Sequence, residues 1–170
     1  FVASAALWWP VPAAAARMRW LLVFSQATGL RAAELVRARR ADLVLGDDGY
    51  WLQVHGKGAK NRELPVPESA MEATRVYFSS RGFELETAHP NTPLLALLEL
   101  PKDVAADDQV PGTGAVELPD DEERHRRGFV SYRALYGAFT RFVCAAIEAS
   151  SLTAAERGRA LRASTHWLRH

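Results

Sequence analysis

Three short stretches of the sequence gather residue types that bind anions or move protons. Arg31 follows a glycine turn in "ATGLRAAEL", Lys57 sits between two glycines in "VHGKGAKNRELPVP", and His166 lies three residues before Arg169 in "STHWLRH". A guanidinium binds an anion with two parallel hydrogen bonds, and glycines beside a lysine let the backbone approach a ligand closely. The three stretches together indicate a site that handles an anion.

Each stretch taken alone has a simpler interpretation, in which it carries no function. Arg31 would form a surface salt bridge with Glu34, three residues further along a helix. Lys57 would occupy the tip of a solvated hairpin, where glycine and lysine are common. His166 and Arg169 would form the fraying, polar end of a helix, where cations are favourable.

The histidines at the end of the chain raise the question of a metal. His166 and His170 lie four residues apart, a spacing that can place two ligands on one helical face. The sequence offers no second ligand motif and no cysteine pair, because Cys144 is the single cysteine. We therefore predict no metal and no other cofactor. The lone cysteine also excludes an internal disulfide and fits a reducing cytoplasm.

Length and composition favour one soluble globular domain over residues 1–170. Hydrophobic residues make up 48% of the chain and charged residues 24%. No apolar run approaches the ~20 residues that span a bilayer, so we predict no membrane segment and a cytoplasmic location. The net charge is only +1. Acidic residues crowd into 117–123 and basic residues into 31–40, 57–62, 124–127 and 157–169, a distribution that fits either a basic face or scattered, solvated charge.

The hydrophobic pattern predicts a mainly α (α+β) chain with a small three-stranded antiparallel sheet. Asp47-Asp48-Gly49 is a hairpin turn signal, and Thr153 with Glu156 forms a capping box at the start of a helix. The expected helices cover 13–28, 31–39, 68–81, 131–149 and 153–162, with a last one at 166–170, and the expected strands cover 43–45, 50–55 and 62–66.

The periodic signal weakens between residues 84 and 128. A short helix is expected within 91–101, and the rest reads as a loop rich in proline, glycine and aspartate. A loop this long is uncommon within a compact domain, so we predict an insertion or a mobile segment at 84–128.

The order of the three stretches resembles the tyrosine recombinase, or phage integrase, family. An arginine follows "TG-L", a lysine in a glycine hairpin precedes "K-x-R-x-x-P-x-P", and H-x-x-R comes last. The resemblance covers residues 14–82 and 130–170. It implies the helical, integrase-type catalytic domain of that family, with a small three-stranded antiparallel sheet.

The resemblance also implies roles for individual residues. Arg31 and Arg169 would clamp the non-bridging oxygens of a scissile DNA phosphate. Lys57 would protonate the departing 5′ oxygen, and His166 would hydrogen-bond the phosphate and assist proton transfer. The further DNA-binding residues that it implies are Lys60, Arg62 and His170.

The family order places a second His or Trp and the nucleophilic tyrosine after H-x-x-R. The tyrosines of this chain all precede that motif, at Tyr50, Tyr77, Tyr132 and Tyr136. We therefore expect a catalytic-domain fragment that lacks the tyrosine segment and the amino-terminal core-binding domain, and that is inactive and monomeric by itself.

The resemblance implies that the full protein is an enzyme of site-specific DNA recombination and integration. It would cleave and rejoin double-stranded DNA through a 3′-phosphotyrosyl intermediate, as a homotetramer on DNA. Two alternatives stay open: a non-catalytic DNA-binding relic of an integrase, and an enzyme similar to type IB topoisomerases.

Overall fold

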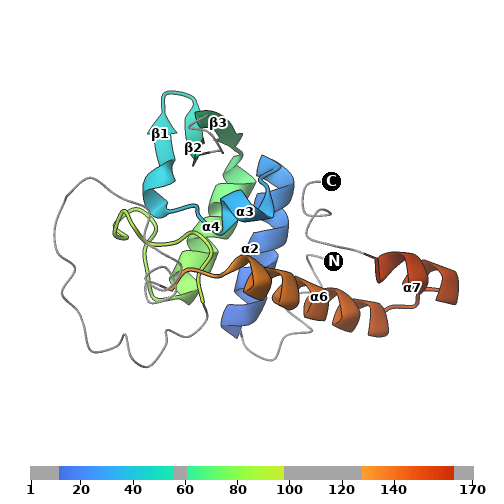
Figure 1. The fold of residues 1–170 in the computed structure, drawn as a ribbon. Helices are drawn as coiled ribbons and strands as arrows, with labels where there is room; N and C mark the ends of the chain where they lie inside the picture. Colours follow the sequence, from blue (N-terminus) through green and yellow to red (C-terminus); the bar gives the residue numbers. More distant parts are fainter. Residues whose placement is uncertain (1–11, 56–60, 98–127, 163–170) are drawn as a thin grey trace.

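The computed structural model describes residues 12–55, 61–97 and 128–162. Within these ranges the chain is mainly helical and carries one small antiparallel sheet, as predicted (Figure 1). The elements in chain order are α2 (Pro12–Thr28), α3 (Ala32–Leu35), the 3₁₀ turn η1 (Arg40–Asp42), β1 (Leu43–Gly46), β2 (Gly49–His55), β3 (Asn61–Val66), α4 (Glu68–Ser80), α6 (Tyr132–Glu148) and α7 (Ala154–Ala160).

The three strands form an antiparallel sheet in the order β1-β2-β3. Gly46 pairs with Gly49 around the predicted hairpin turn, where Gly49 adopts a φ of +129° that glycine tolerates best. Along β2, Leu52 and Val54 are buried while Gln53 and His55 are exposed, so one face of the sheet packs inward. Pro65 lies in β3, at the edge of the sheet, where proline costs least.

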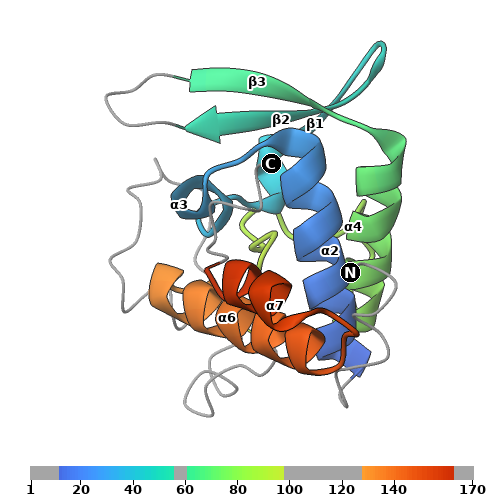
Figure 2. The ribbon, with the colours of Figure 1, turned by 90° about the vertical axis from the view of Figure 1, so that its right-hand side faces the viewer.

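Helices α2 and α4 lie side by side beneath the sheet and form the centre of the core (Figure 2). The ring of Trp20 stacks between those of Phe24 and Tyr77, with centroid separations of 5.0 and 5.1 Å. These three side chains are almost wholly shielded from solvent, so the aromatic stack fixes how α2 packs on α4.

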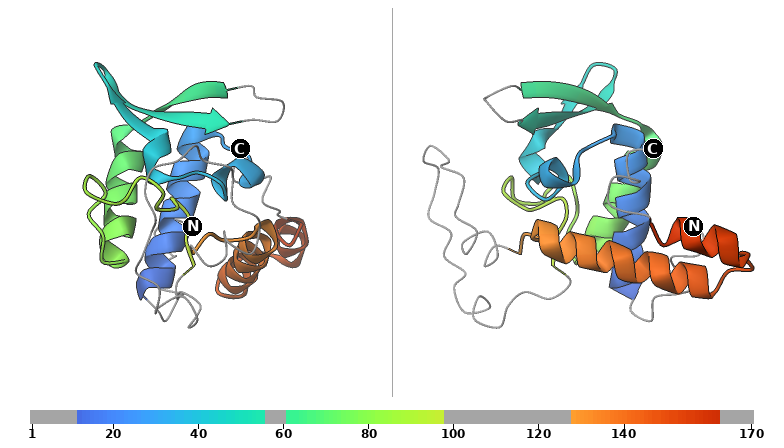
Figure 3. Two further views of the ribbon diagram at one scale, coloured as in Figure 1. Left: turned by 60° about the vertical axis from the view of Figure 1, so that its left-hand side comes forward. Right: turned by 45° about the vertical axis from the view of Figure 1, so that its right-hand side comes forward.

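Helix α6 crosses α2 at a steep angle, and α7 folds back along the second half of α6 (Figure 3). The predicted apolar stripe of α6 is confirmed, because Leu135, Phe139 and Phe142 are buried. The predicted cap of α7 is confirmed as well: Glu156 donates its backbone N–H to Thr153 Oγ1, and its carboxylate accepts the Thr153 backbone N–H at 2.8 Å.

The helix predicted over 31–39 is too long. The helix ends at Leu35, and the chain then turns into an extended pairing with residues 92–94. Leu94 donates its backbone N–H to Ala38 O, and Arg40 donates to Thr92 O, at 2.9 and 2.8 Å. These backbone bonds between distant segments replace the last helical turn.

The helix expected within 91–101 is wrong over residues 91–97, which form a turn, bends and isolated bridges at Pro93 and Ala96. Pro93 has no N–H and disfavours helix for the residue before it, and the Tyr77 hydroxyl accepts the Ala96 backbone N–H at 3.2 Å. Leu85, Leu94 and Leu95 are buried. The beginning of the segment 84–128 therefore packs into the core, while residues 98–127 lie outside the described residues.

Candidate functional site

The turn after α2 presents Arg31 at a defined position. The hydroxyl of Thr28 donates to Phe24 O at 2.7 Å and closes the last turn of the helix. Gly29 then takes a left-handed φ of +61°, and Leu30 buries its side chain at 2% exposure. Since Leu30 anchors the chain in the core, Arg31 emerges directly at the surface with an extended backbone.

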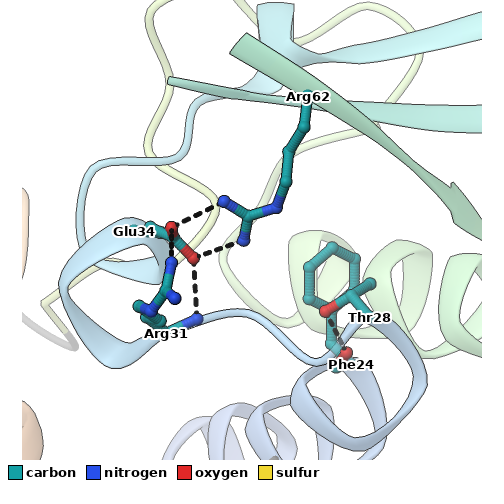
Figure 4. A network of polar contacts seen from close by, with 5 residues as sticks. All are labelled: Phe24, Thr28, Arg31, Glu34 and Arg62. Atoms are coloured by element: carbon teal, nitrogen blue, oxygen red, sulfur yellow. Dashed lines mark hydrogen bonds and ion pairs between the residues drawn. The ribbon is translucent and has the colours of Figure 1, made fainter. Parts of the chain in front are cut away.

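Glu34 holds Arg31 in two ways (Figure 4). Its Oε2 accepts the Arg31 backbone N–H at 2.9 Å, and its Oε1 accepts a hydrogen bond from Arg31 Nη1 at 3.2 Å. The predicted contact between residues 31 and 34 is thus present. The Arg31 side chain still has 62% of its surface exposed, so its guanidinium remains accessible to a ligand.

A second arginine reaches the same carboxylate from the sheet. Arg62 Nη1 donates to Glu34 Oε1 and Arg62 Nη2 donates to Glu34 Oε2, both at 2.8 Å. Side chains alternate along β3, so Arg62 shares the inward face with Leu64 and Val66 and points toward α3 rather than toward solvent. The two parallel bonds give the strong, directional form of an arginine–carboxylate pair.

The electrostatics of the network follow from these contacts. The hydrogen bonds from Arg62 are the largest cause that lowers the pKa of Glu34 to about 2, against a smaller opposing effect of burial. The same pairing raises the pKa of Arg62. Two guanidinium charges meet one carboxylate charge, so the network keeps one net positive charge, and the more exposed guanidinium is that of Arg31.

The two strand ends that flank segment 56–60, which contains Lys57 in the sequence, contact one another and η1. His55 pairs with Asn61 across β2 and β3, and His55 Nδ1 lies 3.1 Å from Asn61 Oδ1. His55 Nε2 lies 3.6 Å from Oδ1 of Asp42, a buried carboxylate that also accepts the Arg39 backbone N–H. His55 and Asn61 are therefore held by pairing in the sheet, and His55 also by Asp42 of η1.

Of the residues predicted to form the site, the structure describes Arg31 and Arg62 and brings them together on Glu34. The others, Lys57, Lys60, His166, Arg169 and His170, lie outside the described residues. Glu34 was predicted to pair with Arg31 alone, and its stronger bond to Arg62 was not predicted. The alternation of residues 62, 64 and 66 was the signal that could have placed Arg62 on the inward face.

Metal-binding groups, membrane spans and pockets are the other features that could carry function in the described chain. Residues 12–55, 61–97 and 128–162 contain no group of three or more His, Cys, Asp or Glu side chains placed to hold a metal. No helix in these same ranges is long and apolar enough to cross a membrane. A pocket between α2 and α6 is mostly apolar, with Arg17 and Arg141 on its wall, and it does not include Arg31 or Arg62.

Comparison with known protein families identifies the family of this chain. Residues 10–111, more than half of the chain, match the phage integrase family. The chain belongs to this family. The matched region contains both Arg31 and Arg62 and every described element from α2 to α4, whereas His166 and Arg169 lie beyond it.

The chain is similar to several tyrosine recombinases. It is 34% identical over 76 residues to tyrosine recombinase XerA of Thermococcus kodakarensis, covering 45% of this chain and 27% of that protein. It is 39% identical over 79 residues to XerD of Rhizobium meliloti, covering 46% and 24%, and 43% identical over 65 residues to XerC of Chlorobaculum parvum, covering 38% and 19%. The matches thus span about a quarter of the relatives' own length or less.

Proposed function

We propose that this chain is the phosphate-binding part of a tyrosine recombinase catalytic domain, which cleaves and rejoins double-stranded DNA at specific sites. One observation carries the proposal: the exposed Arg31 guanidinium is held at the surface by a carboxylate that Arg62 already neutralises. Membership of the phage integrase family and the likeness to three tyrosine recombinases support it.

The chemistry of strand cleavage explains why such an arginine is needed. A phosphodiester under attack accumulates negative charge on its non-bridging oxygens, and fixed donors aimed at those oxygens stabilise the transition state. In the proposed site Arg31 and Arg169 bind these oxygens and His166 hydrogen-bonds the phosphate. Lys57 gives its proton to the departing 5′ oxygen, because an unprotonated alkoxide is a poor leaving group.

The attacking group in the proposal is a tyrosine that follows Arg169 in the complete protein. Among the tyrosines of this chain, Tyr77 is unsuited because its side chain is 1% exposed and burial raises the pKa of its phenol. Its hydroxyl also accepts the Ala96 backbone N–H. In this proposal a protein without the later tyrosine binds DNA but does not form the 3′-phosphotyrosyl bond.

The proposal extends to the complete protein. Because the matched relatives are several times longer than the matched regions, we propose that an amino-terminal core-binding domain completes the clamp around DNA. Residues 1–170 then form one catalytic-domain unit, and four copies act together on paired sites. The segment 84–128 is proposed as an insertion in this unit.

Trapping of the covalent intermediate tests the proposal. The protein expressed from its complete gene is used to select a binding sequence from random DNA duplexes. A suicide substrate with a nick in that sequence is then expected to give a covalent protein–DNA adduct on one tyrosine. Binding without any adduct would contradict the proposal and favour a non-catalytic DNA-binding protein. Relaxation of supercoiled DNA without strand exchange would favour a topoisomerase instead.

A further inference from the structure

We propose that Arg62 is a positioning residue: it occupies the Glu34 carboxylate and thereby keeps the Arg31 guanidinium available for a DNA phosphate. The inference rests on the proposed function for its DNA ligand. It differs from the expectation that Arg62 itself binds DNA, because both terminal nitrogens of Arg62 are bonded within the protein.

The two arginines bind Glu34 unequally. Arg62 uses two bonds of 2.8 Å, whereas the Arg31 side chain uses one bond of 3.2 Å. The Arg62 side chain is 37% exposed and that of Arg31 is 62% exposed. A phosphate that approaches from solvent therefore competes with Glu34 for the Arg31 guanidinium, which holds the weaker and more exposed of the two contacts. When Arg31 binds the phosphate, Glu34 is still neutralised by Arg62.

Removal of the Arg62 charge would reverse this balance. The Glu34 side chain is only 10% exposed, so its carboxylate has little water to replace a lost partner. Arg31 is the other cation bonded to it, and the carboxylate would then bind Arg31 more tightly. The net charge of Arg31, Glu34 and residue 62 would fall from one positive charge to none. Arg31 would then be bound to Glu34 in a neutral ion pair and would attract a phosphate less strongly.

The position of Arg62 also couples two parts of the proposed site. Arg62 pairs with Val54 in the sheet and is separated by one residue from segment 56–60, which contains Lys57 in the sequence. Its bond to Glu34 spans 28 residues of chain and links β3 to α3. One carboxylate thus connects the hairpin stem with the turn that presents Arg31.

The test compares Arg62→Gln, Glu34→Gln and the double variant in the protein expressed from its complete gene. We expect Arg62→Gln to slow single-turnover cleavage roughly 10- to 100-fold, the range typical of a displaced catalytic group. The slope of log K against log salt is expected to become shallower in Arg62→Gln, because Glu34 captures the Arg31 charge, and to return toward the wild-type value when Glu34→Gln is added. Glu34→Gln added to Arg62→Gln is expected to restore much of the rate, since the carboxylate that captures Arg31 is gone.

Arg75→Gln is the matched control. Arg75 has the same 37% side-chain exposure and also forms ion pairs, with Glu68 and Glu86. It reports what the loss of an ion-paired surface arginine does to stability and cleavage without touching Glu34. We expect its cleavage rate to match that of the wild type once folded protein is counted.

Two results would overturn the inference. One is a salt slope that falls by about one in Arg62→Gln, with no rescue by Glu34→Gln, which would make Arg62 a phosphate contact. The other is additive effects of the two substitutions on the free energy of unfolding, which would show that the pair is not coupled. The unfolding cycle needs no DNA, so it separates failure of this inference from failure of the proposed function.

Discussion

Trp20 on α2 donates its indole Nε1 proton to Thr74 Oγ1 on α4 across 2.9 Å, and both side chains are completely buried. The Thr74 hydroxyl donates in turn to Ala70 O at 2.7 Å. This relay joins the two helices on which the sheet rests. Because α2 leads directly into the turn that presents Arg31, the relay also fixes the base of the candidate site (Figure 2).

Thr74→Val is expected to destabilise the protein by about 1–3 kcal/mol. Valine has nearly the same shape but leaves the indole N–H of Trp20 buried without its acceptor, which costs the desolvation energy of that group. Denaturant unfolding measures the change. Thr74→Ser keeps the hydroxyl and is expected to cost less; equal losses in both variants would show that the bond contributes little.

Gly29→Ala and Gly158→Ala are expected to have opposite effects. An added Cβ meets no atom within 4 Å at either position, so packing does not distinguish them. Gly29 has a φ of +61°, and alanine there is expected to cost about 1–2 kcal/mol in the free energy of unfolding. Gly158 lies within α7, where alanine is expected to add about 0.5–1 kcal/mol. Thermal unfolding of both variants checks the signs.

Acidification is expected to weaken the Glu34–Arg62 pair. The pKa of Glu34 is lowered to about 2 in the fold, below its value of about 4.3 in an unfolded chain. The ionised carboxylate therefore stabilises the fold above about pH 4.3, and that contribution is lost as the pH falls toward 2. We expect a loss of about 1–3 kcal/mol over this window. In Glu34→Gln, the free energy of unfolding should not show this loss between about pH 4.3 and pH 2.

Arg31→Ala is expected to leave stability and most DNA affinity intact while cleavage slows about 100- to 1000-fold in the complete protein. Its side chain is mostly exposed, so truncation leaves no cavity. Arg31→Lys is expected to restore little, because an ammonium cannot reproduce the planar, two-pronged hydrogen bonding of a guanidinium. A cleavage assay beside a binding assay separates the two effects, and a wild-type cleavage rate in Arg31→Ala would remove Arg31 from the site.

Sequence reasoning worked where neighbouring residues decide the structure. The turn at Asp47–Gly49, the cap at Thr153 and the break after Thr28 are all present, because each depends on the conformational preference of a few adjacent residues. It failed where the chain meets a distant segment. The helix over 31–39 was too long because residues 38–40 bond to residues 92–94, which no local pattern reveals.

The sequence by itself determined the local elements and the order of the motifs that resemble the integrase family, since both are properties of short stretches of chain. It also placed Arg31 beside Glu34, because three residues span one helical turn. Only the tertiary structure decided that the Glu34 carboxylate forms its shortest hydrogen bonds with Arg62, which lies 28 residues away on another element. That choice depends on how the inward face of β3 packs over α3, and the packing of distant side chains is a property of the folded chain as a whole.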